Sequence, residues 1–166
     1  MGWFDRAALP AHDYEALAEA CGGPVRVLAW GRGSSKVVVG LADRLAWGGA
    51  DEWTFLGWDL IDQGRWDPTT KTLSWRCEGV PGQVVLDETG RLPDLFRERV
   101  GASILLQRPV SVRQKKLALI AARRNPGRPD APVQWRVLVP EEGLDDDDRA
   151  RVAEELARVR AEYDIG

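Results

Sequence analysis

Hydrophobic and polar residues alternate with a period of two over much of the first ninety residues, in short runs separated by Gly, Pro and Asp. A period of two is typical of strands, and the intervening residues favour turns. The pattern predicts strands over Val25–Ala29, Lys36–Leu41, Leu45–Trp47, Trp53–Ile61, Gln63–Trp66, Thr72–Cys77 and Gln83–Leu86. Because the links between them are short, we expect an antiparallel meander that curls as it twists.

Two segments around this meander have the spacing of three and four residues that is typical of amphipathic helices. The first begins near Asp13, which is expected to cap it, and ends at Gly22. The second covers Leu92–Leu106 and is expected to end before Pro109. Its apolar face, which includes Phe96, is expected to cover the open end of the curved sheet.

The last third of the chain predicts two more strands and a helix. The strands, Lys116–Ala122 and Val133–Val139, are joined by a proline-rich loop, and a helical pattern runs from Leu144 to Tyr163. The predicted fold class is α+β: a curved antiparallel sheet or partly open barrel of about seven strands, capped by an amphipathic helix and extended by a C-terminal β-hairpin and helix. At 166 residues the chain is expected to be one domain, with a core over 24–106 and an extension over 109–166.

The order of these elements resembles that of the pleckstrin-homology-like (PH-like) superfamily, in its small bacterial and GRAM-like forms. The residues that carry the resemblance are Trp53–Trp66, Leu73–Trp75 and Leu92–Leu106, within about residues 24–106. The resemblance implies a binding module, since known members mostly bind phosphoinositides, peptides or other proteins. Lipid-binding members have a basic cluster in the first hairpin, which here offers only Arg26, Arg32 and Lys36.

Charge is segregated along the C-terminal part of the chain. Eight basic residues and one acid lie between Arg108 and Arg136, whereas ten acids and four bases follow from Glu141 onward. In one interpretation the acidic helix packs beside the basic hairpin and neutralises it. In the other, the hairpin binds an anion or an acidic partner. The candidate binding residues are Arg113, Lys115, Lys116, Arg123, Arg124 and Trp135.

The residues that usually carry catalysis are few, or they occur where structural roles are expected. A single histidine, His12, leaves little room for a His-based triad or a His-rich zinc site. The carboxylates of Asp59, Asp62 and Asp67 could serve acid–base chemistry, but their surroundings favour turns and strand edges. The run 145–148 resembles a metal cluster, yet consecutive carboxylates are also favoured at a helix start.

Cysteine and glycine motifs give no stronger indication of chemistry. Cys21 and Cys77 are far apart in sequence without a CxxC motif, so we expect two buried thiols and no disulfide. The segment 31–36 lacks the spacing of a phosphate-binding loop and leads into a β-branched run, so we expect a hairpin turn. Most of the eight tryptophans are expected to fill the core.

Together these observations predict a non-catalytic binding or adaptor module that recognises a protein or peptide. An anion-binding function, for nucleic acid or an acidic membrane surface, is the alternative, and a carboxylate-dependent enzyme is a more remote one. No catalytic residue, metal site or cofactor is predicted. No apolar run is long enough to span a bilayer, and Asp5 and Arg6 interrupt the N-terminal segment, so a cytoplasmic location is expected.

Overall fold

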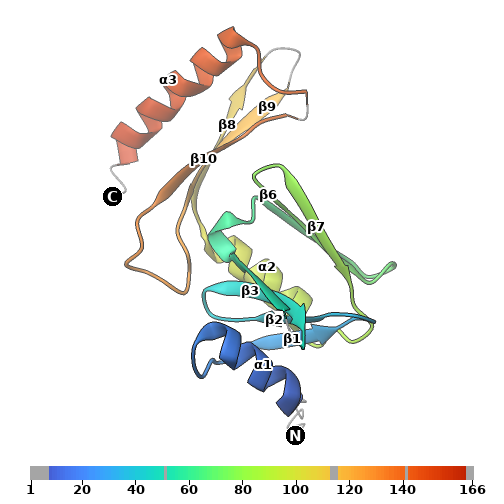
Figure 1. Cartoon of the computed structure of the whole chain (residues 1–166). Helices are drawn as coiled ribbons and strands as arrows, with labels where there is room; N and C mark the ends of the chain where they lie inside the picture. Colours follow the sequence, from blue (N-terminus) through green and yellow to red (C-terminus); the bar gives the residue numbers. More distant parts are fainter. Residues whose placement is uncertain (1–7, 51, 113–115, 141, 164–166) are drawn as a thin grey trace, which may run out of the picture. The chain divides into compact units, whose positions relative to one another are not determined.

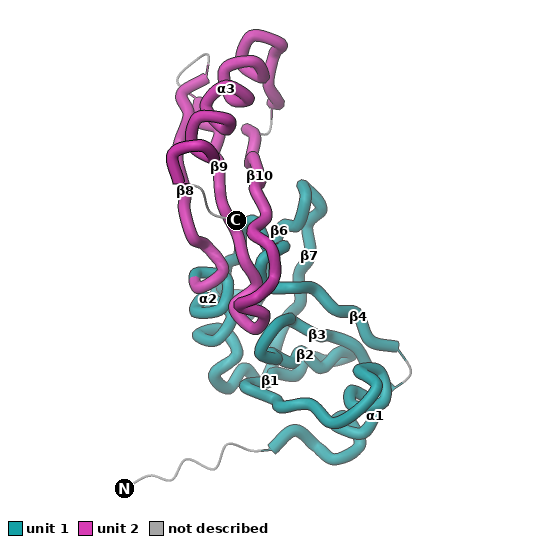
Figure 2. The backbone as a smooth tube through the Cα atoms, turned by 90° about the vertical axis from the view of Figure 1, so that its left-hand side faces the viewer, with its two compact units in different colours: residues 1–101 teal, residues 102–166 magenta. Residues whose placement is uncertain are grey.

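The computed structural model describes residues 8–50, 52–112, 116–140 and 142–163. In this part of the chain the fold is α+β, with three antiparallel sheets and three α-helices (Figure 1). The chain divides into two compact units, residues 1–101 and 102–166 (Figure 2). The α+β class and the antiparallel pairing that the sequence predicts are therefore confirmed.

Unit 1 begins with a four-stranded meander in the order β1-β2-β3-β4. Its strands are Ala29–Arg32, Val37–Gly40, Arg44–Gly49 and Glu52–Gly57. The segment between β1 and β2 is a tight hairpin, in which the Gly33 N–H donates to the carbonyl oxygen of Lys36 at 2.9 Å. The hairpin turn expected for this segment is confirmed.

A second meander in unit 1 has three strands in the order β5-β6-β7, with the bounds Gln63–Asp67, Thr72–Cys77 and Val80–Val85. The short 3₁₀-helix η1, Trp58–Leu60, separates it from the first sheet. Unit 1 therefore has seven strands, as the alternation predicts, but they form two sheets of four and three strands instead of one continuous sheet.

Helix α2, Leu92–Ala102, packs against both sheets of unit 1. Its buried side chains Leu92, Leu95 and Phe96 join a core cluster with residues of both meanders. Two glycines permit this close approach. A Cβ at Gly40 of β2 would lie 2.3 Å from Leu95 Cδ2, and a Cβ at Gly64 of β5 would lie 2.2 Å from Phe96 Cε1. Phe96 is buried on the apolar face of α2, as predicted, but it packs in a core shared by two sheets instead of covering the open end of one curved sheet.

Helix α1, Ala11–Cys21, covers the other face of the four-stranded sheet. Leu17 is fully buried against Val37 and Val39, which explains why β2 is buried on both faces. The prediction that Asp13 caps this helix is wrong, because Pro10 occupies the N-cap position. Asp13 lies in the first turn and forms an ion pair with Arg32 of β1.

Unit 2 contains the sheet β8-β9-β10 and helix α3. The elements are β8 Ile104–Ser111, β9 Leu117–Arg123, β10 Gln134–Leu138 and α3 Asp146–Tyr163. Val152 and Leu156 of α3 pack on one face of the sheet, against Ala118 and Ile120. The loop between β9 and β10 is irregular, as its prolines predict.

Several predicted boundaries are wrong, including that of β7, which begins at Val80 instead of Gln83. The first strand is Ala29–Arg32, four residues later than expected, and the fourth ends at Gly57 where η1 begins. Helix α2 ends at Ala102, and the next residues form β8, so the extension is a three-stranded sheet with a helix instead of a hairpin with a helix. Pro109 lies within the edge strand β8, where a missing N–H is tolerated.

Seven of the eight tryptophans lie in the described part of the chain, and all seven contribute to a hydrophobic cluster. Trp58 is fully buried, and its Nε1 donates to the carbonyl oxygen of Leu41 at 2.9 Å. The rings of Trp47 and Trp75 are in contact, with centroids 4.9 Å apart and planes tilted by 52°. The expectation that most tryptophans fill the core is confirmed in part, because Trp58 and Trp75 are buried and the other five are partly buried against the clusters.

Candidate functional site

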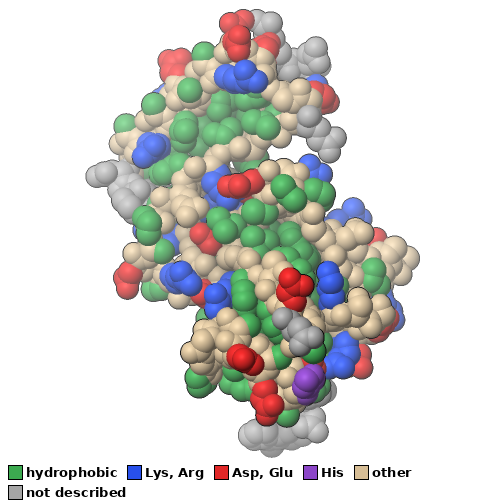
Figure 3. All heavy atoms as spheres, viewed as in Figure 1, with side chains coloured by type: hydrophobic (Ala, Val, Ile, Leu, Met, Phe, Trp, Pro, Cys, Tyr) green, Lys and Arg blue, Asp and Glu red, His purple; other side chains and the backbone are tan. Residues whose placement is uncertain are grey.

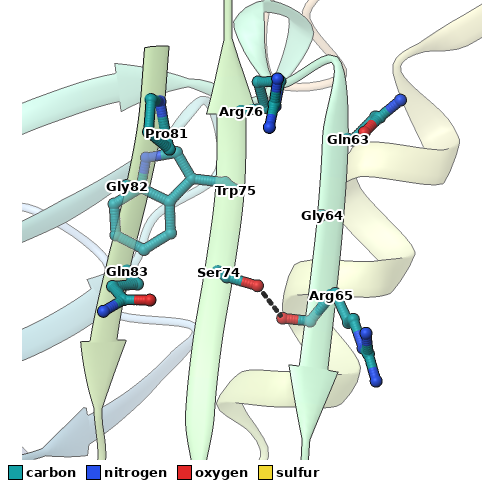
Figure 4. A pocket seen from close by; sticks show the side chains of 9 residues that line it. All are labelled: Gln63, Gly64, Arg65, Ser74, Trp75, Arg76, Pro81, Gly82 and Gln83. Atoms are coloured by element: carbon teal, nitrogen blue, oxygen red, sulfur yellow. Dashed lines mark hydrogen bonds between the residues drawn. The ribbon is translucent and has the colours of Figure 1, made fainter. Parts of the chain in front are cut away.

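A shallow, open hollow of about 660 Å³ lies on the three-stranded sheet of unit 1 (Figure 4). It lies over the middle of the sheet, and each strand contributes three consecutive residues. Its lining residues are Gln63, Gly64, Arg65, Ser74, Trp75, Arg76, Pro81, Gly82 and Gln83. We refer to this set as the sheet hollow.

The hollow follows from the alternation of side chains along paired strands. Trp75 of β6 pairs with Gly64 of β5 and with Gly82 of β7, so these three residues form a row across the sheet. The side chain of Trp75 points toward the core, and the Cβ positions of the two glycines lie on the same face. The rows on either side direct their side chains outward, because successive side chains lie on opposite faces. The middle row therefore presents backbone at the floor, and the neighbouring rows form two walls, one of which includes Pro81.

The two glycines of the middle row are required by their neighbours. A Cβ at Gly82 would lie 2.3 Å from Trp75 Nε1, because the indole ring lies across the adjacent strand (Figure 4). A Cβ at Gly64 would overlap the ring of Phe96. Large aromatic side chains thus fill the inner side of the sheet at both glycines, and this packing keeps the floor of the hollow free of side chains.

The outer edge of β5 offers unpaired backbone groups. The Leu86 N–H donates to the carbonyl oxygen of Lys71 at 2.9 Å, and these residues lie opposite each other when the register of β6 and β7 is extended by one pair. Hydrogen-bonded and non-bonded pairs alternate in an antiparallel ladder. The alternation places the N–H and C=O groups of Gly64 and Trp66 at the free edge of β5.

The free edge of β7 is less suited to pairing. By the same alternation, its outward positions include Pro81, which has no N–H. The carbonyl oxygen of Val85 lies beside the β1–β2 hairpin, since a Cβ at Gly33 would be 2.2 Å from it. The β5 edge is therefore the more accessible template for an added strand.

The walls of the hollow carry two arginines. Arg65 and Arg76 are exposed, and neither has an ion-pair partner within 4.0 Å among the residues that the structure describes. One carboxylate, Asp67, follows Arg65 by two positions on the same face of β5. Hydrogen bonds from the backbone N–H groups of Thr69 and Thr70 lower the pKa of Asp67, and the charge of Arg65 contributes to the same shift.

The candidate residues predicted in the basic segment are dispersed. Arg113 and Lys115 lie outside the described residues. Lys116 forms an ion pair with Glu142 at 3.0 Å. The pKa of the Glu142 carboxyl is lowered, mainly by a hydrogen bond from its own backbone N–H and further by Lys116. Trp135 is half-buried and packs in the core cluster of unit 2, so its ring is not presented as an exposed stacking surface.

Arg123 and Arg124 occupy different environments from those expected of a basic surface. Arg123 is only 1% exposed, and its Nε and Nη2 atoms both donate to Ser103 Oγ, at 3.1 and 2.5 Å. Arg124 is half-buried and donates from Nε to the carbonyl oxygen of Ala131 at 3.1 Å. Both guanidinium groups hold parts of unit 2 together.

Arg108, the first basic residue of the segment 108–136, also forms ion pairs within unit 2. Arg108 of β8 lies 3.5 Å from carboxylate oxygens of both Glu155 and Glu162 on α3, and it donates to the Tyr163 hydroxyl at 3.3 Å. Desolvation acts to lower the pKa of Arg108, but these contacts outweigh it and raise the pKa. On the face shown in Figure 3, basic and acidic side chains are interspersed. The geometry thus favours the interpretation of internal neutralisation.

Most of the carboxylates considered for catalysis or metal binding accept hydrogen bonds from backbone N–H groups. Asp62 Oδ2 accepts from the Glu78 N–H at 2.9 Å, and Asp67 organises the turn after β5. Asp145 Oδ1 accepts from the Asp148 N–H at 2.8 Å, at the start of α3. Asp59 is 9% exposed in η1. The predicted turn and helix-start roles of Asp62, Asp67 and Asp145 are confirmed.

The remaining chemical candidates have ordinary settings. His12 is exposed on α1. Cys21 and Cys77 are not joined in a disulfide, and each is half-buried instead of fully buried. Within the described ranges, no three His, Cys, Asp or Glu side chains are grouped so that they could hold a metal ion.

No local motif in the sequence marks the wall residues of the sheet hollow as a site. The signal was present in the alternation, because the polar residues of three consecutive strands fall on one face once the register is known. That register depends on the two turns between the strands and on the core packing of Trp75, neither of which marks a binding site in the sequence.

Comparison of the chain with protein-family models, with curated proteins and with solved structures gave no match. Among the described residues, no helix combines the length and the apolar character needed to cross a bilayer.

Proposed function

We propose that the chain is a non-catalytic binding module that recognises a polypeptide, and that the β5 edge with the adjoining sheet hollow receives it. The observation that carries this proposal is the combination, on one small sheet, of a free strand edge and a concave face whose lining includes Arg65 and Arg76. Extended peptides bind in this way elsewhere, by adding a strand whose main chain supplies affinity while side-chain sites supply specificity.

The order of elements in unit 1 supports the same proposal. Two antiparallel meanders of four and three strands are followed by an amphipathic helix, which is the order expected of a PH-like module. Helix α2 fixes the three-stranded sheet through Phe96, so the candidate edge is held by a rigid core. Fold resemblance alone does not establish function, and the proposal therefore rests on the edge and the hollow.

Anion binding through residues 108–136 has less support. Arg108, Lys116, Arg123 and Arg124 all have partners within unit 2. An anion at this segment would compete with these contacts. The geometry favours the sheet of unit 1 as the binding surface.

Selection from a displayed library of random twelve-residue peptides, with the full chain as bait, tests the proposal. We expect enriched peptides. On addition of a synthetic enriched peptide, amide hydrogen exchange should slow at Gly64 and Trp66, whose N–H groups face outward, and remain unchanged at Gln83 on the opposite edge. Failure to enrich any peptide, or protection confined to other residues, would show that the β5 edge is not a polypeptide site.

A further inference from the structure

We propose that the sheet hollow selects acidic peptides, and that Arg65 and Arg76 bind carboxylates carried on alternate residues of the added strand. This inference rests on the proposed polypeptide-binding function and names the chemistry of its ligand. Both arginines belong to unit 1 and lie among the described residues.

The geometry of strand addition decides which ligand side chains reach the hollow. A strand paired with β5 directs every second side chain to the outer face of the sheet. Those side chains lie beside the outward-facing residues of β5, which are Gln63, Arg65 and Asp67. Three consecutive outer positions of the ligand therefore meet an amide, a guanidinium and a carboxylate.

The guanidinium of Arg65 favours an acidic side chain directly opposite it. Opposite charges at facing positions of paired strands attract, and an arginine can hold a carboxylate with two parallel hydrogen bonds. The Arg65 side chain is exposed, and Asp67 lies two positions further along the same strand. It is therefore available to a ligand at the free edge.

Arg76 of β6 adds a second cation, beside Gln63, which is the outward-facing residue of β5 that precedes Arg65. It pairs with Gln63 in the register, so it lies two strand spacings, about 10 Å, from a strand added to β5. A long acidic side chain reaching over Gln63 and the extended side chain of Arg76 together cover this distance. The amide of Gln63 lies between them and can donate to the same carboxylate.

Asp67 determines at which end of the added strand acidic residues are disfavoured. Its carboxylate is held in the ionised form by two backbone N–H groups, so an acidic ligand residue opposite it would be repelled. The expected preference is acidic beside Gln63, acidic beside Arg65, and neutral or basic beside Asp67. The ligand is therefore an extended acidic segment with a defined end.

Parallel peptide selections on four full-length baits test this inference: the wild type, Arg65→Gln, Arg65→Glu and Arg97→Gln. Arg97 is the matched control, because its side chain is 85% exposed on α2 and its replacement removes the same charge. Urea unfolding of each bait verifies that the fold is retained. The dissociation constant of a synthetic wild-type peptide is then measured on these baits and on Arg76→Gln.

The expected wild-type pool is enriched in Asp and Glu at two alternate positions. Each of Arg65→Gln and Arg76→Gln weakens the peptide about fivefold, in line with one exposed ion pair, whereas Arg97→Gln leaves affinity unchanged. The Arg65→Glu bait selects Lys or Arg at the corresponding position. A wild-type pool without acidic enrichment, or equal losses in the Arg97 control, overturns the inference while leaving polypeptide binding intact. An empty wild-type pool overturns both.

Discussion

Replacing Gly64 by alanine adds one methyl group at the point where helix α2 packs against the three-stranded sheet. The new Cβ would lie 2.2 Å from Phe96 Cε1 and 2.7 Å from Cζ, so the ring must move by more than an ångström to restore ordinary contact. The ring is only 2% exposed and stands edge-on to Trp58, with centroids 6.0 Å apart. Moving the ring would therefore disturb its contact with the fully buried Trp58.

The expected effect is the difference between two opposing terms. Overpacking a well-filled core costs about 1–3 kcal/mol. Replacing glycine by alanine also restricts the unfolded chain, which stabilises the native state by about 0.4–1 kcal/mol where the backbone conformation is compatible. The φ of Gly64 is not in the left-handed region, so this gain applies. We expect Gly64→Ala to lower the free energy of unfolding by about 1–2 kcal/mol.

Urea denaturation followed by tryptophan fluorescence measures this change, and Gly101→Ala is the matched control. Gly101 lies near the end of α2, and a Cβ there would meet nothing within 4 Å. Alanine is the better helix former, so this control should be stabilised by up to about 1 kcal/mol. The same chemical substitution thus has opposite predicted signs at two positions.

A double-mutant cycle with Phe96→Leu tests whether the ring causes the loss. Leucine removes part of the ring that the new methyl group would meet, so Gly64→Ala should cost less in the Phe96→Leu background. A coupling energy of at least about 0.5 kcal/mol is expected for residues in contact. Wild-type stability of Gly64→Ala, or additive effects in the cycle, would refute this account of how α2 packs against the sheet.

Three further predictions concern single hydrogen-bonded groups. Trp58→Phe leaves the buried carbonyl of Leu41 without its indole donor, so thermal unfolding should show a loss of about 1–3 kcal/mol. Asp145→Ala removes the acceptor at the start of α3 and should cost about 1 kcal/mol in urea unfolding, whereas Asp146→Ala on the exposed first turn should cost less. Asp67→Asn should be less stable than the wild type at pH 7. Because the pKa of Asp67 is lowered in the folded state, the stability gap should be full above about pH 4 and should shrink as the pH falls through that lowered value; a gap independent of pH would contradict the role of its charge.

Local patterns in the sequence were sufficient to predict most elements of the fold. The β-branched run Val37–Val39 and the alternation around Trp75 were interpreted as strands, and the periodicity around Phe96 as a helix. These segments have one dominant period and clear turn residues at their ends. Local patterns therefore predict the number of strands in unit 1 but not their division into two sheets.

Other features depended on contacts that no local pattern encodes. The residues Ile104–Leu106 continue the apolar spacing of α2, and only their pairing with β9 makes them part of the strand β8. Arg123 looks like a surface cation in the sequence, yet it is buried because Ser103, twenty residues earlier, receives its donors. The walls of the sheet hollow likewise required the register of three strands. In each case the deciding partner lies far away in the sequence.

The contact between Trp47 and Trp75 makes the junction of the two sheets in unit 1 optically distinct. Two indole rings 4.9 Å apart and tilted by 52° have electronic transitions that couple, and such coupling gives a paired band in the far-ultraviolet circular dichroism spectrum. One ring belongs to β3 and the other to β6. Loss of that band during unfolding therefore reports the moment at which the sheets separate, independently of the signal from the backbone of either sheet.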